Sequence, residues 1–233
     1  HDALPIFQWA IGRGGPNMRK RLMARIDEGT FRRAEPAHLA PFRDPQRRFV
    51  VFLADFLAET EQPLRAEELY LELLDGEHGA LSPGEEAYAR FGASWSLWYH
   101  GTLHDDAERI ARSSAVTRPF FDRADLRATA IAPRVLLAAG NAYAYRSDVD
   151  PELRDDMERA YQLVIREYPG TQYQAQAMCY LGMHLMARTD PSARSRGRQL
   201  LERARDEFPD GPLHQVIPRM LDRMPTPTQE TQR

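Results

Sequence analysis

Cysteine is almost absent from this chain: Cys179 is alone among 233 residues. A single cysteine cannot form an intramolecular disulfide, which excludes a disulfide-stapled fold and leaves both the cytoplasm and the periplasm open as compartments. Lysine is equally scarce, since Lys20 is the one lysine among 31 basic residues. No apolar run reaches the roughly 18 residues of a membrane helix. The remaining composition, 42% hydrophobic and 28% charged, is ordinary for a globular protein.

Motifs that carry catalysis are also missing. No Gly-x-Ser-x-Gly sequence occurs. The glycine-rich stretch 12–15 lacks the preceding strand and the following Lys-Ser/Thr of a phosphate loop, so it is interpreted as a disordered segment or a turn. Cys179 and His184 suggest a nucleophile and base, but Cys179 lies in an apolar stripe, where a free cysteine packs as a small hydrophobe. We therefore expect no catalytic residue and no cofactor.

One cluster has the spacing of metal ligands. His100 and His104 stand at i and i+4, and Asp105 and Asp106 follow directly. Two histidines one helical turn apart can share a metal ion. We favour the interpretation that these residues mark helix ends and do not bind a metal. Gly101-Thr102 suggests the end of a helix, and the two aspartates suit the start of the next. We accordingly predict no metal site, and a metal-dependent enzyme stays the weakest alternative.

Charge is uneven along the chain. Residues 13–48 carry ten basic and four acidic residues, whereas residues 54–110 carry three basic and thirteen acidic ones. The basic stretch can contact phosphates, but it lacks aromatic interleaving and any DNA-binding motif. A solvated face that pairs with the acidic neighbour is favoured over a nucleic-acid site.

The N-terminal residues 1–7, HDALPIF, resemble translated adapter sequence at the broken end of a reading frame. In that interpretation the protein begins upstream of residue 1, and any signal peptide or lipoprotein cysteine lies in that upstream part. The alternative is a processed, mature chain. The compartment, cytoplasm or periplasm, is left undecided.

Apolar spacing at i, i+3, i+4 and i+7 recurs through the chain, with proline and glycine between the stretches. This pattern predicts an all-α fold. The expected helices are 17–28, 46–59, 64–75, 84–100, 104–114, 123–146, 151–167, 172–188, 191–207 and 212–223. We expect three regions: a basic, partly irregular segment 1–45, a helical domain 46–224 and a disordered tail 225–233.

A repeat of about 40 residues is visible near the C-terminus. Gly140 and Gly182 stand 42 residues apart in similar apolar segments, and the pairs Tyr168-Pro169 and Phe208-Pro209 end the segments that follow. A fixed period of this size indicates stacked helical hairpins, because one hairpin cannot bury its apolar face alone. Pairing the helices predicts four hairpins, 46–75, 84–114, 130–168 and 172–208. Helix 212–223 would cover the open end.

These hairpins resemble tetratricopeptide (TPR) repeats. The residues that carry the resemblance are Leu53, Ala54, Leu57, Ala66 and Tyr70; Tyr88, Gly92, Trp95 and Ala107; Leu136, Gly140, Tyr143, Tyr161 and Pro169; and Met178, Leu181, Gly182, Leu185, Gly197, Leu201, Ala204 and Pro209. A small residue at a helix crossing lets two backbones approach closely. The inter-helix spacing departs from the family in three hairpins, which resemble the longer repeats of bacterial envelope proteins.

The resemblance implies an α-solenoid, with about four TPR-like repeats and a C-terminal capping helix, that acts as a non-enzymatic scaffold or adaptor. Its concave groove would bind a protein or an extended peptide. The groove residues that the family geometry implies are Arg48, Asp55, Glu86, Ser96, Arg134, Asn141, Tyr145, Gln176, Met183 and Met186. The alternative is an accessory or regulatory domain of a larger enzyme or sensor whose N-terminal part lies upstream.

Overall fold

The computed structural model of the chain describes residues 40–59, 62–146, 151–211, 217–218 and 221, and every regular element in these ranges is a helix. The all-α prediction is confirmed for this part of the chain. Two compact units divide between Ala132 and Pro133. The predicted helix 17–28 and the tail 225–233 lie outside the described residues.

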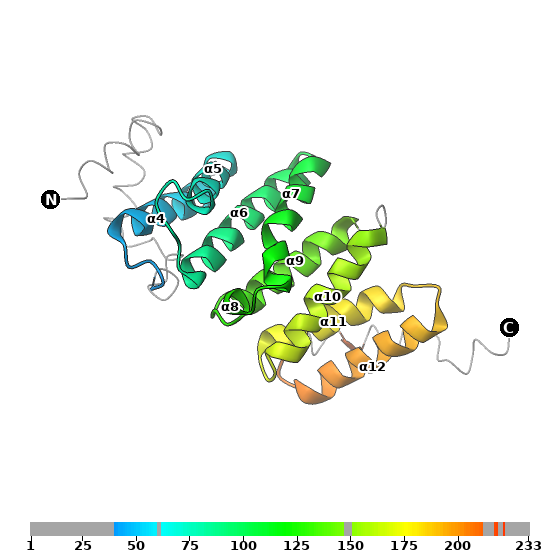
Figure 1. The fold of residues 1–233 in the computed structure, drawn as a ribbon. Coiled ribbons are helices and arrows are strands. Elements are labelled where there is room, and N and C mark those ends of the chain that lie inside the picture. The colour runs from blue at the N-terminus through cyan, green and yellow to red at the C-terminus, as the bar shows by residue number, and fades with distance from the viewer. Residues whose placement is uncertain (1–39, 60–61, 147–150, 212–216, 219–220, 222–233) are drawn as a thin grey trace, which may run out of the picture. The chain divides into compact units, whose positions relative to one another are not determined.

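The first unit is a series of helices that pack against their neighbours in chain order (Figure 1). Its elements are α4 (Pro45–Glu59), α5 (Pro63–Leu74), α6 (Pro83–Leu103), α7 (Ala107–Thr117), the 3₁₀ helix η1 (Arg118–Phe121) and α8 (Ala124–Arg127). In addition, α4 contacts α6, and α8 contacts both α6 and η1.

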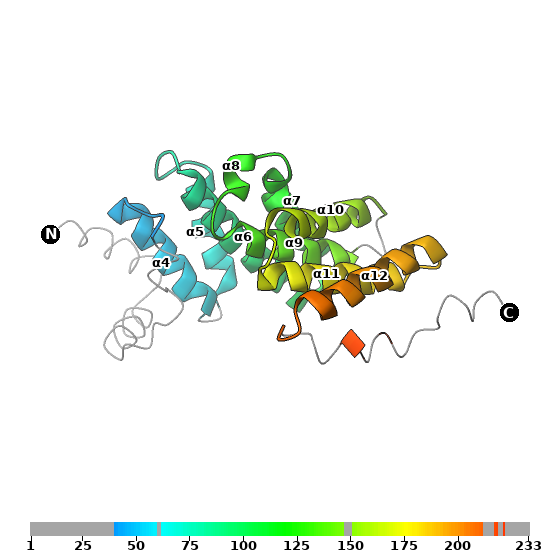
Figure 2. The same cartoon turned by 90° about the horizontal axis from the view of Figure 1, so that it is seen from below.

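In the second unit, too, helices pack against their neighbours in chain order. Its helices are α9 (Ala132–Arg146), α10 (Pro151–Glu167), α11 (Gln172–Met186) and α12 (Pro191–Glu207). Helix α10 packs on α11, and α11 packs on α12, which lie side by side in Figure 2. That the helices of the two units form one continuous solenoid stays a prediction.

Local sequence signals explain where most helices begin. Prolines occupy the first turns of α5, α6 and α12, where the missing N–H is not needed. Ser82 and Glu85 form a reciprocal capping box at the start of α6, and Arg47 from α4 donates to the same Glu85 at 3.0 Å. Asp190 accepts two backbone N–H groups at the start of α12. These helices start within a residue of the predicted positions.

Three predicted helices had wrong boundaries. The helix expected over 104–114 runs from Ala107 to Thr117, where Asp106 caps the first turn by accepting the backbone N–H of Arg109. The single helix expected over 123–146 is interrupted at residues 128–131, because Pro133 opens a new helix and the hydroxyl of Thr129 bonds the carbonyl of Leu126 at 2.7 Å. The helix expected to end at His100 continues to Leu103. Gly101 does not stop it; a glycine stands there because it lies against Ile110 of α7, where a side chain would collide.

The first unit has a continuous apolar core. Phe56 and Leu57 of α4, Tyr70 of α5 and Tyr88 of α6 belong to it. Phe42 packs edge-to-face on Tyr88, with ring centroids 5.7 Å apart. The core therefore includes a residue upstream of the predicted domain start at 46.

The second unit has a core cluster between α11 and α12. Its members are Met178, Cys179, Met186, Leu201, Ala204, Ile217 and Leu221. Ile217 and Leu221 are helical in the structure and come from the predicted capping helix 212–223, most of which lies outside the described residues. Cys179 is buried as predicted, and burial raises the pKa of its thiol to about 11.

The same close helix crossing occurs in two hairpins of this unit. A Cβ atom placed on Gly140 of α9 would lie 2.5 Å from the Tyr161 ring of α10. A Cβ atom on Gly182 of α11 would lie 2.9 Å from Leu201 and 3.0 Å from the carbonyl oxygen of Gly197, both on α12. The glycines that mark the sequence repeat thus occupy matching crossings, which supports the hairpin assignment.

We expect Gly140→Ala to lower the free energy of unfolding by about 1–3 kcal/mol, because the added methyl group would overlap the Tyr161 ring. In an unobstructed helix the same change raises stability by up to about 1 kcal/mol, so the sign of the effect is diagnostic. Urea unfolding followed by circular dichroism measures it. As a control, Tyr161→Ala makes room for the methyl group, and an equal loss with and without this second change would contradict the crossing.

Candidate functional site

The predicted groove residues of the first unit differ in accessibility. Arg48 is exposed on α4. Glu86 is bonded within the unit, to Arg90 at 2.8 Å and to Arg123 at 2.7 Å. Ser96 is only 1% exposed and lies in the interior. Ser96 therefore does not line an accessible groove, because its side of α6 packs inward.

Asp55 connects three helices. Its carboxylate accepts hydrogen bonds from the hydroxyls of Tyr70 on α5 and of Tyr88 on α6, the latter at 2.9 Å. Both tyrosine rings are buried in the first core. The carboxylate predicted to anchor a ligand thus satisfies two polar groups of the protein itself.

The second unit repeats this arrangement. The hydroxyl of Tyr161 on α10 donates to the amide oxygen of Asn141 on α9 at 2.6 Å. Asn141 follows Gly140 as Asp55 follows Ala54, so the two hairpins place an Asx acceptor at the same position. Asn141 is an exposed residue.

The other predicted residues of the second unit have different environments. Arg134 is exposed and Gln176 is partly exposed. Met183 packs at the edge of the α11–α12 core, and Met186, at 8% exposure, belongs to that core. The side chain of Tyr145 lies outside the described residues. Met186 is therefore a packing residue and not an accessible groove residue.

Among the residues that the structure describes, the three most exposed large apolar side chains lie elsewhere, on one face of α6. Trp95, Tyr99 and Leu103 follow one another at intervals of four residues and are 44%, 46% and 63% exposed. Trp95 packs on Trp98, with ring centroids 5.4 Å apart. We call these three residues the α6 stripe. Its spacing is visible in the sequence, but the groove prediction did not include it.

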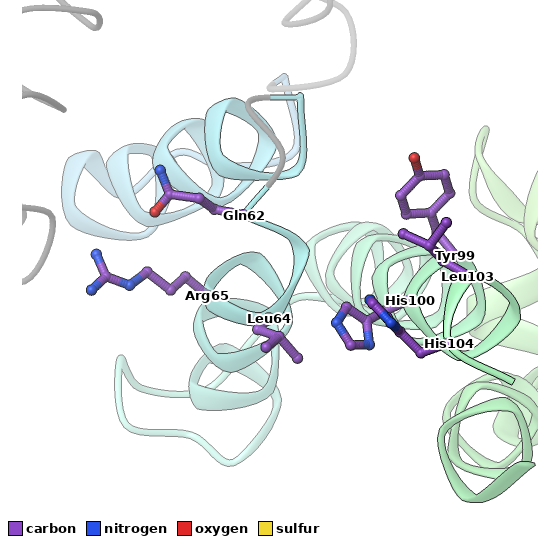
Figure 3. Close-up of a pocket in the computed structure, with 7 residues that line it drawn as sticks. All are labelled: Gln62, Leu64, Arg65, Tyr99, His100, Leu103 and His104. Atoms are coloured by element: carbon purple, nitrogen blue, oxygen red, sulfur yellow. The ribbon is translucent and has the colours of Figure 1, made fainter. Parts of the chain in front are cut away.

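The α6 stripe continues into a pocket between the start of α5 and the end of α6 (Figure 3). The pocket has a volume of about 480 Å³. It is lined by Gln62, Leu64, Arg65, Tyr99, His100, Leu103 and His104. Leu64 is 41% exposed, so α5 adds an apolar side chain opposite the stripe. A solvent-exposed apolar surface beside a pocket of this size is typical of a binding site.

His100 and His104 lie side by side in this pocket, with ring centroids 4.3 Å apart. Burial lowers the pKa of His100, and His104 and Arg109 lower it further, while Asp106 has the opposite effect. The Nδ1 atom of His100 is buried and has no hydrogen-bond partner. Within the described residues, no group of three or more His, Cys, Asp or Glu side chains is arranged to hold a metal ion. The imidazole pair is thus a feature of the pocket wall.

The comparisons with known proteins give no assignment. No family model, curated protein or solved structure matches this chain. Among the helices that the structure describes, none is both long and apolar enough to cross a membrane. The function of this chain must therefore be inferred from its own geometry.

Asp55→Ala is expected to lower the free energy of unfolding by about 2–4 kcal/mol, because it removes the carboxylate that accepts hydrogen bonds from two buried tyrosine hydroxyls. Asp55→Asn retains one acceptor oxygen and should cost less. Urea unfolding of both variants tests this. Arg48→Ala, at an exposed position of the same helix, is the control and should change stability by less than about 0.5 kcal/mol. An Asp55→Ala variant as stable as this control would contradict the structural role of the carboxylate.

Proposed function

We propose that this chain is a non-enzymatic helical protein that binds a segment of another protein. The observation that carries the proposal is the α6 stripe with its adjoining pocket in the first unit. Three large apolar side chains exposed on one helix face provide the contact area that protein interfaces use. Tyr99 also combines apolar area with a polar tip, a property common in residues that dominate binding energy.

The construction of the hairpins supports a repeat protein. Gly140 and Gly182 make the same close crossings, and Asp55 and Asn141 accept tyrosine hydroxyls at matching positions. Recurring hairpins with a constant interior and variable exposed residues are the basis on which TPR-like proteins bind peptides. On this proposal the resemblance seen in the sequence reflects a scaffold or adaptor, with the α6 stripe as its principal contact surface.

The pocket gives the surface a way to select among segments. An exposed stripe alone favours any apolar partner, whereas a pocket of about 480 Å³ admits one large side chain with adjoining main chain. Leu64 and Leu103 would contact that side chain from α5 and α6. The stripe would then contact the residues on either side of it.

The test is selection of peptides from a random display library on the purified chain. We expect selected peptides to bind the double variant Tyr99→Ser and Leu103→Ser at least about tenfold more weakly, because truncation of central apolar contacts costs 1–3 kcal/mol or more. Fluorescence anisotropy with labelled peptides measures the dissociation constants. Both positions are exposed, and circular dichroism verifies that the variant is folded.

The matched control is the double variant Arg48→Ala and Arg134→Ala, which changes two exposed residues of the sequence-predicted groove. Loss of binding in the stripe variant alone supports the proposal. Loss in the control alone would transfer binding to the predicted groove. Failure of the library to yield any binding peptide would overturn the function itself.

A further inference from the structure

The last turn of α6 differs from what the sequence suggests. The sequence favours a helix end at Gly101-Thr102, between His100 and His104, and the preference against a metal site depends on that interruption. In the structure α6 continues to Leu103, and the backbone N–H of His104 donates to the carbonyl oxygen of His100 at 3.2 Å. The two histidines therefore belong to one unbroken helical turn.

This turn places both imidazoles on one face of the helix. Side chains four residues apart on a helix lie one above the other. Figure 3 shows the two rings on the side of α6 that is directed toward Leu64, and both line the same pocket. Their centroids are 4.3 Å apart and their planes are inclined by 39°. Because a zinc–imidazole bond is about 2.0–2.1 Å long, rings this close can reach one ion after a rotation of the exposed His104 side chain.

The nitrogen atoms of the pair are not used by the rest of the protein. The Nδ1 atom of His100 is buried and has no hydrogen-bond partner. The ring of His104 forms no hydrogen bond or ion pair with any residue that the structure describes. A buried polar atom without a partner is uncommon in folded proteins, and a bound ion is one physical explanation of it. Neutral imidazole nitrogens are the commonest metal ligands in proteins.

The neighbouring charged residues do not oppose a cation. Arg109, at the start of α7, pairs with Glu67 and, at 3.3 Å, with Asp106, so two carboxylates offset its charge. Asp105, which follows His104 directly, is exposed. Asp106 also accepts the backbone N–H of Arg109 at 3.1 Å, so its carboxylate is engaged in capping α7.

The pair provides two ligands and no more. Among the described residues, no third His, Cys, Asp or Glu side chain is placed to complete a metal site. A tetrahedral ion at the pair would keep two further coordination positions. The adjoining pocket of about 480 Å³ has room there for water or for a ligand from outside the protein.

We propose that His100 and His104 together bind one divalent transition-metal ion of the class that includes zinc, nickel and copper. Imidazole suits these ions, and their general order of affinity places Cu²⁺ above Ni²⁺ and Zn²⁺. The inference does not rest on the proposed protein-binding function, because the metal alone is the ligand. Each of the two proposals can therefore fail without the other.

The first test is calorimetric titration of the purified chain with zinc chloride at pH about 7.5, above the ordinary histidine pKa of about 6.5. We expect His100→Gln and His104→Gln each to weaken zinc binding at least about tenfold, since loss of even a second-shell partner typically costs 10–100-fold. The double variant should bind little more weakly than either single one, because one remaining imidazole cannot chelate. His104 is exposed, so its substitution tests the site without disturbing the core.

The matched control is His184→Gln. His184 is a partly exposed histidine of α11 whose neighbours one turn away are Tyr180 and Arg188, so no second imidazole stands beside it. This variant should bind zinc as the parent chain does. Circular dichroism verifies that every variant is folded.

The second test locates the ion. A metal that joins the two rings holds the same turn that the His104 N–H closes on the His100 carbonyl. Zinc should therefore slow hydrogen exchange of the His104 amide in the parent chain but not in the His100→Gln variant. Nuclear magnetic resonance of the labelled chain measures this exchange.

The outcomes decide the inference. Zinc binding that both single variants lose and the His184→Gln variant keeps, with slower exchange at His104, supports it. Undetectable zinc binding at millimolar concentrations overturns it, as does a double variant that binds zinc as tightly as the parent chain. Neither of these negative results would affect peptide binding by the α6 stripe.

Discussion

The close approach of paired helices at glycine is the constraint on which the second unit depends. At Gly140 and Gly182 the absence of a side chain lets Tyr161 and Leu201 lie directly on the opposing backbone. This contact determines how near the helices come and which residue of the partner enters the crossing. In the hairpin with Tyr161 it also determines where the hydroxyl ends, beside Asn141. The packing of the Tyr161 ring on Gly140 and the hydrogen bond from Tyr161 to Asn141 therefore both follow from the close approach of the two helices.

Much of the helical arrangement was predictable, because local signals mark it. Prolines in first turns and caps such as Ser82 and Asp190 define helix starts from nearby residues alone. The errors occurred where contacts between residues distant in the sequence determine where a helix ends. Gly101 suggests a helix end in isolation, yet α6 continues through it, and the glycine is explained by Ile110 of the next helix, which occupies the space beside it. From the sequence alone, Pro133 could lie inside one long helix or in the first turn of a new one. The turn at Thr129 ends the preceding helix, so Pro133 lies in the first turn of a new helix.

The proposed binding surface was harder to predict, since residue type does not reveal whether a polar group already has a hydrogen-bond partner within the protein. Asp55 and Glu86 were reasonable ligand contacts, but their partners Tyr88 and Arg123 lie 33 and 37 residues away and only folding brings them together. The stripe presented the opposite difficulty. Helix α6 carries apolar residues on more than one side, and the sequence does not tell which side the neighbouring helices cover. Leu97 is buried, whereas Leu103 on the same helix is not.

The position of Asp55 has a consequence for how the first two hairpins behave as parts. One carboxylate on α4 accepts from α5, in its own hairpin, and from α6, in the next. Phe42 likewise packs from before α4 onto Tyr88 of α6. A fragment that begins at α6 would thus lose the acceptor of one tyrosine and the cover of its ring together. These two hairpins are therefore not independent folding units, and they should fold and unfold as one cooperative segment.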